Sequence, residues 1–209
     1  MKKKFLTILS LLLISISLHA QDNNGSKRHG KIGFTYASFG KNNVFRSEEK
    51  GGVQNIDGLD FKTVGITYIQ PLIASLELEM GLEYSKHTIL ASPDGVSFRN
   101  AKFTLVNIPV ALRVNLFKYI FVNTGVFLDI DKMSDGPIES QKGIGGLFGV
   151  GLQYDFDVGV SIFVNPYFKL HSLIQFTPVD NHQQIRESGL RFGLTYDLGG
   201  RKVKYATAK

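Results

Sequence analysis

The chain has 209 residues, which suits one domain large enough to bury a core. It contains no cysteine, so disulfide scaffolds, thiolate metal sites, cysteine nucleophiles and a lipid-modified N-terminal cysteine are excluded. Its 24 Lys and Arg against 18 Asp and Glu give a formal charge of +6. No apolar run reaches the ~18 residues of a membrane-spanning helix, which argues against an α-helical membrane protein.

The first 20 residues have the pattern of a secretory signal peptide. Lys2, Lys3 and Lys4 precede an apolar run over residues 5–18, and Ala20 supplies a small residue at the expected cleavage point. We predict that residues 1–20 are removed on export. The formal charge then falls to +3, because three lysines leave with the signal. This weak basic balance predicts no nucleic-acid partner.

A polar leader over residues 21–29 comes before segments in which apolar and polar residues alternate. In residues 74–85, for example, Leu78, Met80 and Leu82 fall on one side of an extended chain and Glu77 and Glu79 on the other. Such alternation predicts β-strands with one apolar face. The predicted strands cover residues 31–38, 61–69, 74–85, 103–115, 119–130, 143–155, 160–171 and 189–198.

The connections between these segments alternate in length. Long ones are expected at residues 39–59, 87–101, 131–142 and 172–187, and short ones lie between. This alternation is typical of outer-membrane barrels and has no counterpart in a soluble sandwich with Greek-key crossings. The sequence therefore predicts an all-β fold, an eight-stranded antiparallel up-and-down transmembrane β-barrel over residues 30–198. A basic periplasmic tail, residues 199–209, is expected to follow it.

If the apolar faces meet lipid, the charged residues of the strands point into the lumen. An eight-stranded barrel is just wide enough for side chains to fill it, and charges of both signs can pair there. We therefore expect a plugged barrel, in which inward glycines such as Gly145, Gly149 and Gly151 relieve crowding. The expected structural charge network consists of Glu77, Glu79, Glu83, Arg113, Asp129, Lys169, Arg191 and Asp197.

Residues 106–114 read VNIPVALRV, and residues 119–125 read YIFVNTG. This stretch resembles the PorT-like small outer-membrane β-barrels of Bacteroidetes, the "outer membrane protein beta-barrel domain" family. Asn107 stands where that family usually has Glu. Near the end of the chain, Arg191, Gly193, Tyr196 and Leu198 resemble the last-strand signal read by the barrel-assembly machinery. The resemblance implies the outer membrane of a Gram-negative bacterium, and some members are linked to type IX secretion and gliding.

No catalytic, cofactor-binding or metal-binding residue is predicted. The glycines at 145–151 lack the strand–turn–helix context of a dinucleotide loop, and the acidic residues at 129–135 lack calcium-loop spacing. His87 with Ser85 or Ser92, and His171 with Ser172, could supply parts of a hydrolase site.

The predicted function is therefore that of a non-enzymatic outer-membrane barrel with a structural, accessory or surface-interaction role, and the resemblance links that role to secretion or envelope assembly. Its loops 39–59 and 172–187 would contact an envelope or surface protein partner, and outer-membrane lipid would surround the barrel. Two alternatives stay open: a lipid or lipopolysaccharide hydrolase, and a narrow channel for small solutes.

Overall fold

The computed structural model describes residues 29–46, 56–73, 75–91, 99–132, 140–176 and 183–199. The predicted signal peptide, residues 21–28 of the leader and residues 200–209 of the tail lie outside these ranges. The described chain forms eight strands: β1 (Lys31–Arg46), β2 (Ile56–Pro71), β3 (Leu76–Ala91), β4 (Arg99–Asn115), β5 (Ile120–Lys132), β6 (Gly143–Asp155), β7 (Val160–Gln175) and β8 (Gln183–Asp197).

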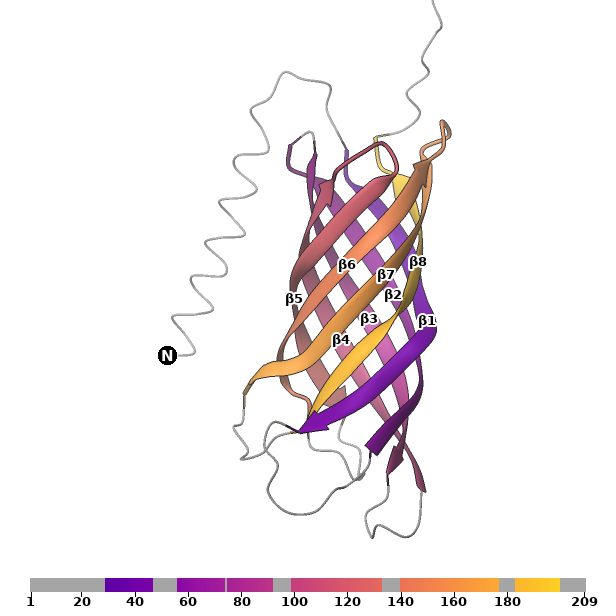
Figure 1. Ribbon diagram of the computed structural model, residues 1–209. Helices are drawn as coiled ribbons and strands as arrows, with labels where there is room; N and C mark the ends of the chain where they lie inside the picture. Colours follow the sequence, from indigo (N-terminus) through magenta and orange to yellow (C-terminus); the bar gives the residue numbers. More distant parts are fainter. Residues whose placement is uncertain are drawn as a thin grey trace, which may run out of the picture.

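These strands close into one barrel in the order β1 to β8, and every neighbouring pair is antiparallel (Figure 1). Closure is made by β1 and β8, where Lys31 pairs with Asp197 and Phe34 with Leu194. The predicted fold class is confirmed. The short connections from β2 to β3, from β4 to β5 and from β6 to β7 lie together at the upper end in Figure 1, near the start of β1 and the end of β8. We call this the short-turn end and the opposite end the far end.

None of the residues that the structure describes belongs to a helix long and apolar enough to cross a membrane.

Several strands are longer than predicted, because they continue toward the far end. β1 continues to Arg46, β3 to Ala91, and β8 begins at Gln183, so the predicted loops 39–59, 87–101 and 172–187 were wrong over these stretches. Two features hid the extensions. Their outward side chains include lysines, such as Lys41, which remove the apolar face. A register shift between Ser38 and Lys41 also breaks the period of two.

The outer surface of the barrel carries a continuous band of exposed apolar side chains. Phe34 is 70% exposed and Val150 43%. Soluble monomers rarely expose so large an apolar area. We call this band the apolar belt; it comprises Phe34, Val64, Ile66, Leu82, Ile108, Val110, Leu112, Val126, Phe148, Val150, Leu152, Ile162, Phe192 and Leu194.

The inside of the barrel is packed with side chains. Toward the far end, Ile89, Leu105 and Ile185 are fully buried and form one apolar cluster with Phe103. Elsewhere, inward phenylalanines lie against glycines of the neighbouring strand. A Cβ atom on Gly145 would collide with the ring of Phe127, for example. These glycines therefore make room for large rings inside a narrow cylinder.

Candidate functional site in the barrel lumen

Three glutamates of β3 point into the lumen at successive levels, and each lies within ion-pair distance of a cation from another strand. Glu77 Oε2 lies 3.3 Å from Arg113 Nε of β4, and Glu79 Oε1 lies 2.7 Å from Arg191 Nη1 of β8. These side chains are at most 8% exposed.

The third glutamate, Glu83, uses Oε2 to accept a 2.5 Å hydrogen bond from Lys169 Nζ of β7. Because β7 and β8 are not neighbours of β3, the pairs made by Lys169 and Arg191 cross the lumen. Charges buried in this way remain ionised only when they are paired and hydrogen-bonded. The lumen at these levels is therefore filled by mutually dependent side chains.

Arg113 is the largest fully buried side chain among the described residues. Its guanidinium lies 3.5 Å from the ring centroid of Phe121 and 5.3 Å from that of Phe163, and one Nη donates to Gln153 Oε1. A planar guanidinium suits such stacking better than a lysine ammonium does. Arg113 therefore closes the lumen near the short-turn end with an ion pair and two aromatic rings.

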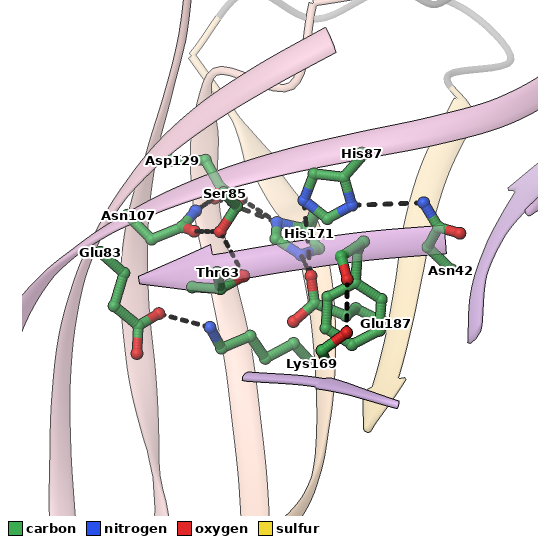
Figure 2. Close-up of polar contacts among 12 residues, drawn as sticks. Asn42, Thr63, Glu83, Ser85, His87, Asn107, Asp129, Lys169, His171 and Glu187 are labelled. Atoms are coloured by element: carbon green, nitrogen blue, oxygen red, sulfur yellow. Dashed lines mark hydrogen bonds and ion pairs between the residues drawn. The ribbon is translucent and has the colours of Figure 1, made fainter. Parts of the chain in front are cut away.

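A chain of hydrogen bonds runs along the inner face of the barrel wall, over the neighbouring strands β2 to β5 (Figure 2). The hydroxyls of Thr63 and Ser85 lie 2.8 Å apart, and the Ser85 hydroxyl donates to Asn107 Oδ1 at 3.1 Å. Asn107 Nδ2 in turn donates to the carboxylate of Asp129. Asn107, which stands in place of the glutamate of the resembling family, thus joins Ser85 to Asp129 without adding a charge.

Next to Asp129, two histidines and a glutamate converge in the half of the lumen nearer the far end. Figure 2 shows His87 of β3, His171 of β7 and Glu187 of β8 turned toward one another. Glu187 Oε2 lies 3.4 Å from His87 Nε2 and 3.7 Å from His171 Nε2. All three side chains are 0% exposed. We call these three residues the His–Glu cluster.

Other lumen groups fix the orientation of the His–Glu cluster. His171 Nδ1 lies 3.1 and 3.2 Å from the two carboxylate oxygens of Asp129, and the Tyr167 hydroxyl donates to Glu187 Oε1 at 2.5 Å. His87 Nδ1 lies 3.3 Å from Asn42 Nδ2, and its ring stacks on Phe103 with 4.9 Å between centroids.

A bulge in β7 turns Ser172 into the lumen beside His171, which follows the inward alternation of Tyr167 and Lys169. Three residues, His171 to Leu173, separate Leu170 from Ile174, whereas on β6 only Gly145 separates their partners. Ser172 adopts a φ of 50°, so the side chains of both His171 and Ser172 are buried. The backbone N–H of Ser172 also donates to Asp129 Oδ2 at 3.3 Å. The bulge thus binds the same carboxylate as His171.

Eight charged residues were expected to point into the lumen, and one of them, Asp197, differs from the other seven in its burial. Asp197 is only half-buried at the short-turn end, where Oδ1 accepts the N–H of Gly199 at 2.8 Å. The other seven residues are buried in the lumen: Glu77, Glu79, Glu83, Arg113, Asp129, Lys169 and Arg191.

Sequence reasoning missed Glu187 as a lumen residue, because it placed residues 172–187 in a loop. Extending the period of two back from Arg191 through Gly189 would have put Glu187 and Ile185 on the same inward face. It also left His87 just beyond the end of its strand, in the predicted loop 87–101. No local signal in the sequence joins His87 to His171, because they meet only when β3 and β7 close across the lumen.

The serine–histidine pairs considered for hydrolysis do not form among the described residues. The Ser172 hydroxyl donates to the backbone oxygen of Gln141 at 2.6 Å, and the Ser85 hydroxyl contacts Thr63 and Asn107. Ser92 lies outside the described residues. The geometry therefore offers no activated serine in the part of the lumen that the structure describes.

Taken together, the strands and lumen define a closed antiparallel barrel with an apolar exterior and a charged, side-chain-filled interior. No family model matches the chain, and no curated protein matches its sequence.

Several solved structures share the barrel shape. The outer membrane protein OprG from Pseudomonas aeruginosa is 12% identical with a TM-score of 0.48, and the match covers 82% of this chain and 99% of that chain. Ail, the attachment invasion locus protein of Yersinia pestis, is 9% identical with a TM-score of 0.42, and the match covers 80% of this chain and 99% of that chain. The outer membrane protein AlkL is 14% identical with a TM-score of 0.45, and the match covers 84% of this chain and 93% of that chain. Likeness at this level concerns the fold and says nothing about activity.

Proposed function

We propose that this chain is a non-enzymatic outer-membrane protein of a Gram-negative bacterium, whose sealed barrel anchors a surface used for contact with an envelope or surface partner. The observation that supports it best is the contrast between the two faces of the barrel wall. The apolar belt faces outward, and buried ion pairs made by Glu77, Glu79 and Glu83 fill the interior. An apolar exterior suits lipid, and a filled interior suits an anchor better than a pore.

A group of outward lysines supports this membrane placement. Lys62 and Lys86 are exposed and stand directly opposite each other on β2 and β3, just beyond the apolar belt toward the far end. Lys102 follows on β4. Like charges placed opposite each other destabilise a sheet unless an anion lies between them. Lipid phosphates at the membrane surface would supply that anion.

The resemblance to PorT-like barrels adds the proposal that the host belongs to the Bacteroidetes and that the signal peptide and the barrel-assembly machinery deliver the chain. The tail, residues 199–209, would then lie in the periplasm. The described parts of the far end are the strand extensions, whose outward side chains include Lys41 and Lys102. These extensions and the segments beyond them would form the contact surface.

Ion conductance in planar lipid bilayers tests whether the barrel is sealed. The mature chain is expected to give no stepwise conductance, because Arg113 and the rings around it close the lumen. The double variant Arg113→Ala/Phe121→Ala opens this level alone and is expected to stay silent, because the Glu79–Arg191 and Glu83–Lys169 pairs still cross the lumen; current steps in it would show that this level is the sole barrier. Its matched control, Val114→Ala/Val122→Ala, changes outward side chains at the same level. Steady conductance by the unmodified chain would contradict the anchor and favour the small-solute channel.

Site-specific photo-cross-linking in intact cells tests the contact surface. A photoreactive residue at position 102, beyond the apolar belt, is expected to form an adduct with a protein. The same residue at position 150, inside the belt, should cross-link lipid alone. If neither position 102 nor position 41 captured any protein, the surface-contact role would fail while the sealed barrel could still stand.

A further inference from the structure

We propose that the His–Glu cluster is a binding site for one divalent transition-metal ion, held by His87 Nε2, His171 Nε2 and Glu187 Oε2. The three ligand atoms all lie within 4.8 Å of one another, and come from three strands, β3, β7 and β8. Ligand atoms about 2.1 Å from a tetrahedral ion stand roughly 3.4 Å apart. The measured separations from Glu187 Oε2, 3.4 and 3.7 Å, are close to this value.

The three converging atoms share a second property: none of them has a hydrogen-bond partner. His87 Nε2, His171 Nε2 and Glu187 Oε2 are all buried and unsatisfied among the described residues. Buried polar atoms are nearly always hydrogen-bonded, so three unsatisfied atoms directed at one point need a common partner. A cation would satisfy all three at once.

The charge balance of the lumen points the same way. Among the described residues, five buried carboxylates face three buried side chains that are permanently cationic. Glu77, Glu79 and Glu83 are matched by Arg113, Arg191 and Lys169. Two negative charges are left, on Asp129 and Glu187. A divalent ion beside neutral imidazoles would compensate both.

Asp129 prepares His171 for such a role. Its carboxylate accepts the Nδ1 proton of His171, which leaves the Nε2 lone pair directed toward Glu187. Metal-bound histidines usually donate their second nitrogen to a carboxylate or carbonyl in this way. Asp129 is itself held by Asn107 and the Ser172 amide. It would act as a positioning residue for the metal.

His87 requires one local adjustment. Asn42 Nδ2 faces its Nδ1, an arrangement that leaves the ring proton on Nε2. The Asn42 Oδ1 atom, however, is buried and has no hydrogen-bond partner. Rotating the Asn42 amide would exchange its hydrogen bonds to the backbone oxygens of Asp60 (3.3 Å) and Thr88 (3.4 Å) for one in which Oδ1 accepts the Nδ1 proton of His87, and would free Nε2 to bind the ion. Metal binding would therefore be coupled to the orientation of Asn42.

The donor set also defines the class of ion. Two imidazoles and one carboxylate suit zinc, iron(II), cobalt(II) and similar ions, whereas calcium and magnesium prefer oxygen ligands alone. The rings of Phe103 and Phe127, 4.9 and 5.0 Å from those of His87 and His171, keep the surroundings apolar. We expect a bound ion to link β3, β7 and β8 across the lumen.

Metal analysis of the full chain purified without a histidine tag tests the site. The chain is extracted in mild detergent, dialysed against a weak chelator and analysed for bound metal. It is then titrated with Zn²⁺ and, for a spectrum, with Co²⁺. We expect one ion per chain and a Co²⁺ absorption band typical of nitrogen and oxygen ligands. His171→Asn and Glu187→Gln should each weaken Zn²⁺ binding about 100-fold or more, and Asp129→Asn about 10- to 100-fold.

Two control variants separate this site from adventitious binding. His29→Asn removes an exposed histidine outside the lumen, and Glu79→Gln removes a buried lumen carboxylate away from the cluster. Both should bind Zn²⁺ as the unmodified chain does, with folding of every variant checked by heat-dependent gel migration. If the unmodified chain held no metal and gave no Co²⁺ band, or if His171→Asn bound Zn²⁺ equally well, the proposal would be overturned. The sealed-barrel function could still hold in either case.

Discussion

At the scale of single residues, the lumen is stabilised by buried charges, each of which depends on one or two specific partners of opposite charge. Lys169 Nζ lies 2.5 Å from Glu83 Oε2 and is almost fully buried, so the loss of Glu83 leaves the ammonium without its ion-pair partner. Glu83 itself has a second cation, Arg191, whose Nη1 lies 3.9 Å from Oε1. Removing one member of a buried ion pair usually costs more than removing both, because a lone buried charge must be desolvated without compensation.

Glu83→Gln is therefore expected to lower the free energy of unfolding by about 3 kcal/mol. The double variant Glu83→Gln/Lys169→Met should recover most of that loss, because no unpaired ammonium is left in the lumen. Urea titration of the barrel folded in lipid vesicles measures both values. Unfolding is followed by tyrosine fluorescence, since the chain has no tryptophan, or by circular dichroism. Equal losses for the single and double variants would show that the Lys169–Glu83 pair is not what stabilises this level.

The sequence could place most of these residues on the inward face, but it could not match each glutamate to its own cation. A period of two along residues 74–85 is enough to predict that Glu77, Glu79 and Glu83 share the inward face. The predicted strand faces likewise turned Arg113 and Lys169 inward. Which glutamate meets which cation depends on the stagger of the strands around the barrel, and no local pattern records it. His87, His171 and Glu187 were missed as a group for the same reason.

At the scale of elements, five of the strands, β1 to β4 and β8, have two parts with different exteriors. Near the short turns the outward positions are apolar, whereas the extensions of β1 to β4 and of β8 carry residues such as Lys41, Lys86 and Ser188 outward. Inward side chains of the extensions, such as Asn42, Ile89 and Glu187, are buried as fully as Glu79 and Phe121 nearer the short turns. Sequence alternation finds only the first part, because a strand polar on its outer face and interrupted by a bulge looks like a loop.

This division predicts that charge is tolerated on the extensions and not in the apolar belt. Val150→Arg, in the middle of β6, should destabilise the folded barrel in lipid vesicles by about 2–4 kcal/mol. Ser188→Arg, outward on the extension of β8, should change the free energy of unfolding by less than about 0.5 kcal/mol. The same urea titration compares the two. A similar cost at both positions would mean that the belt does not face lipid.

At the scale of the whole molecule, the barrel is closed by β1 and β8 and filled by ion pairs, aromatic rings and the His–Glu cluster. The closed sheet leaves no free edge, so every backbone group within the wall can be hydrogen-bonded between strands. Eight strands enclose a space that side chains can fill, which explains why the interior is packed. Both properties suit the membrane anchor that we propose.

The orientation of the barrel wall relative to lipid can be measured directly, because the chain has no cysteine and accepts single labels cleanly. Spin labels are placed on Val110→Cys and Val150→Cys in the belt and on Lys102→Cys beyond it, in chains reconstituted in lipid vesicles. Oxygen dissolved in the bilayer should relax the belt labels strongly and a water-soluble nickel complex only weakly, with the reverse at position 102. Belt labels that respond to the nickel complex as strongly as position 102 does would contradict a barrel embedded in lipid.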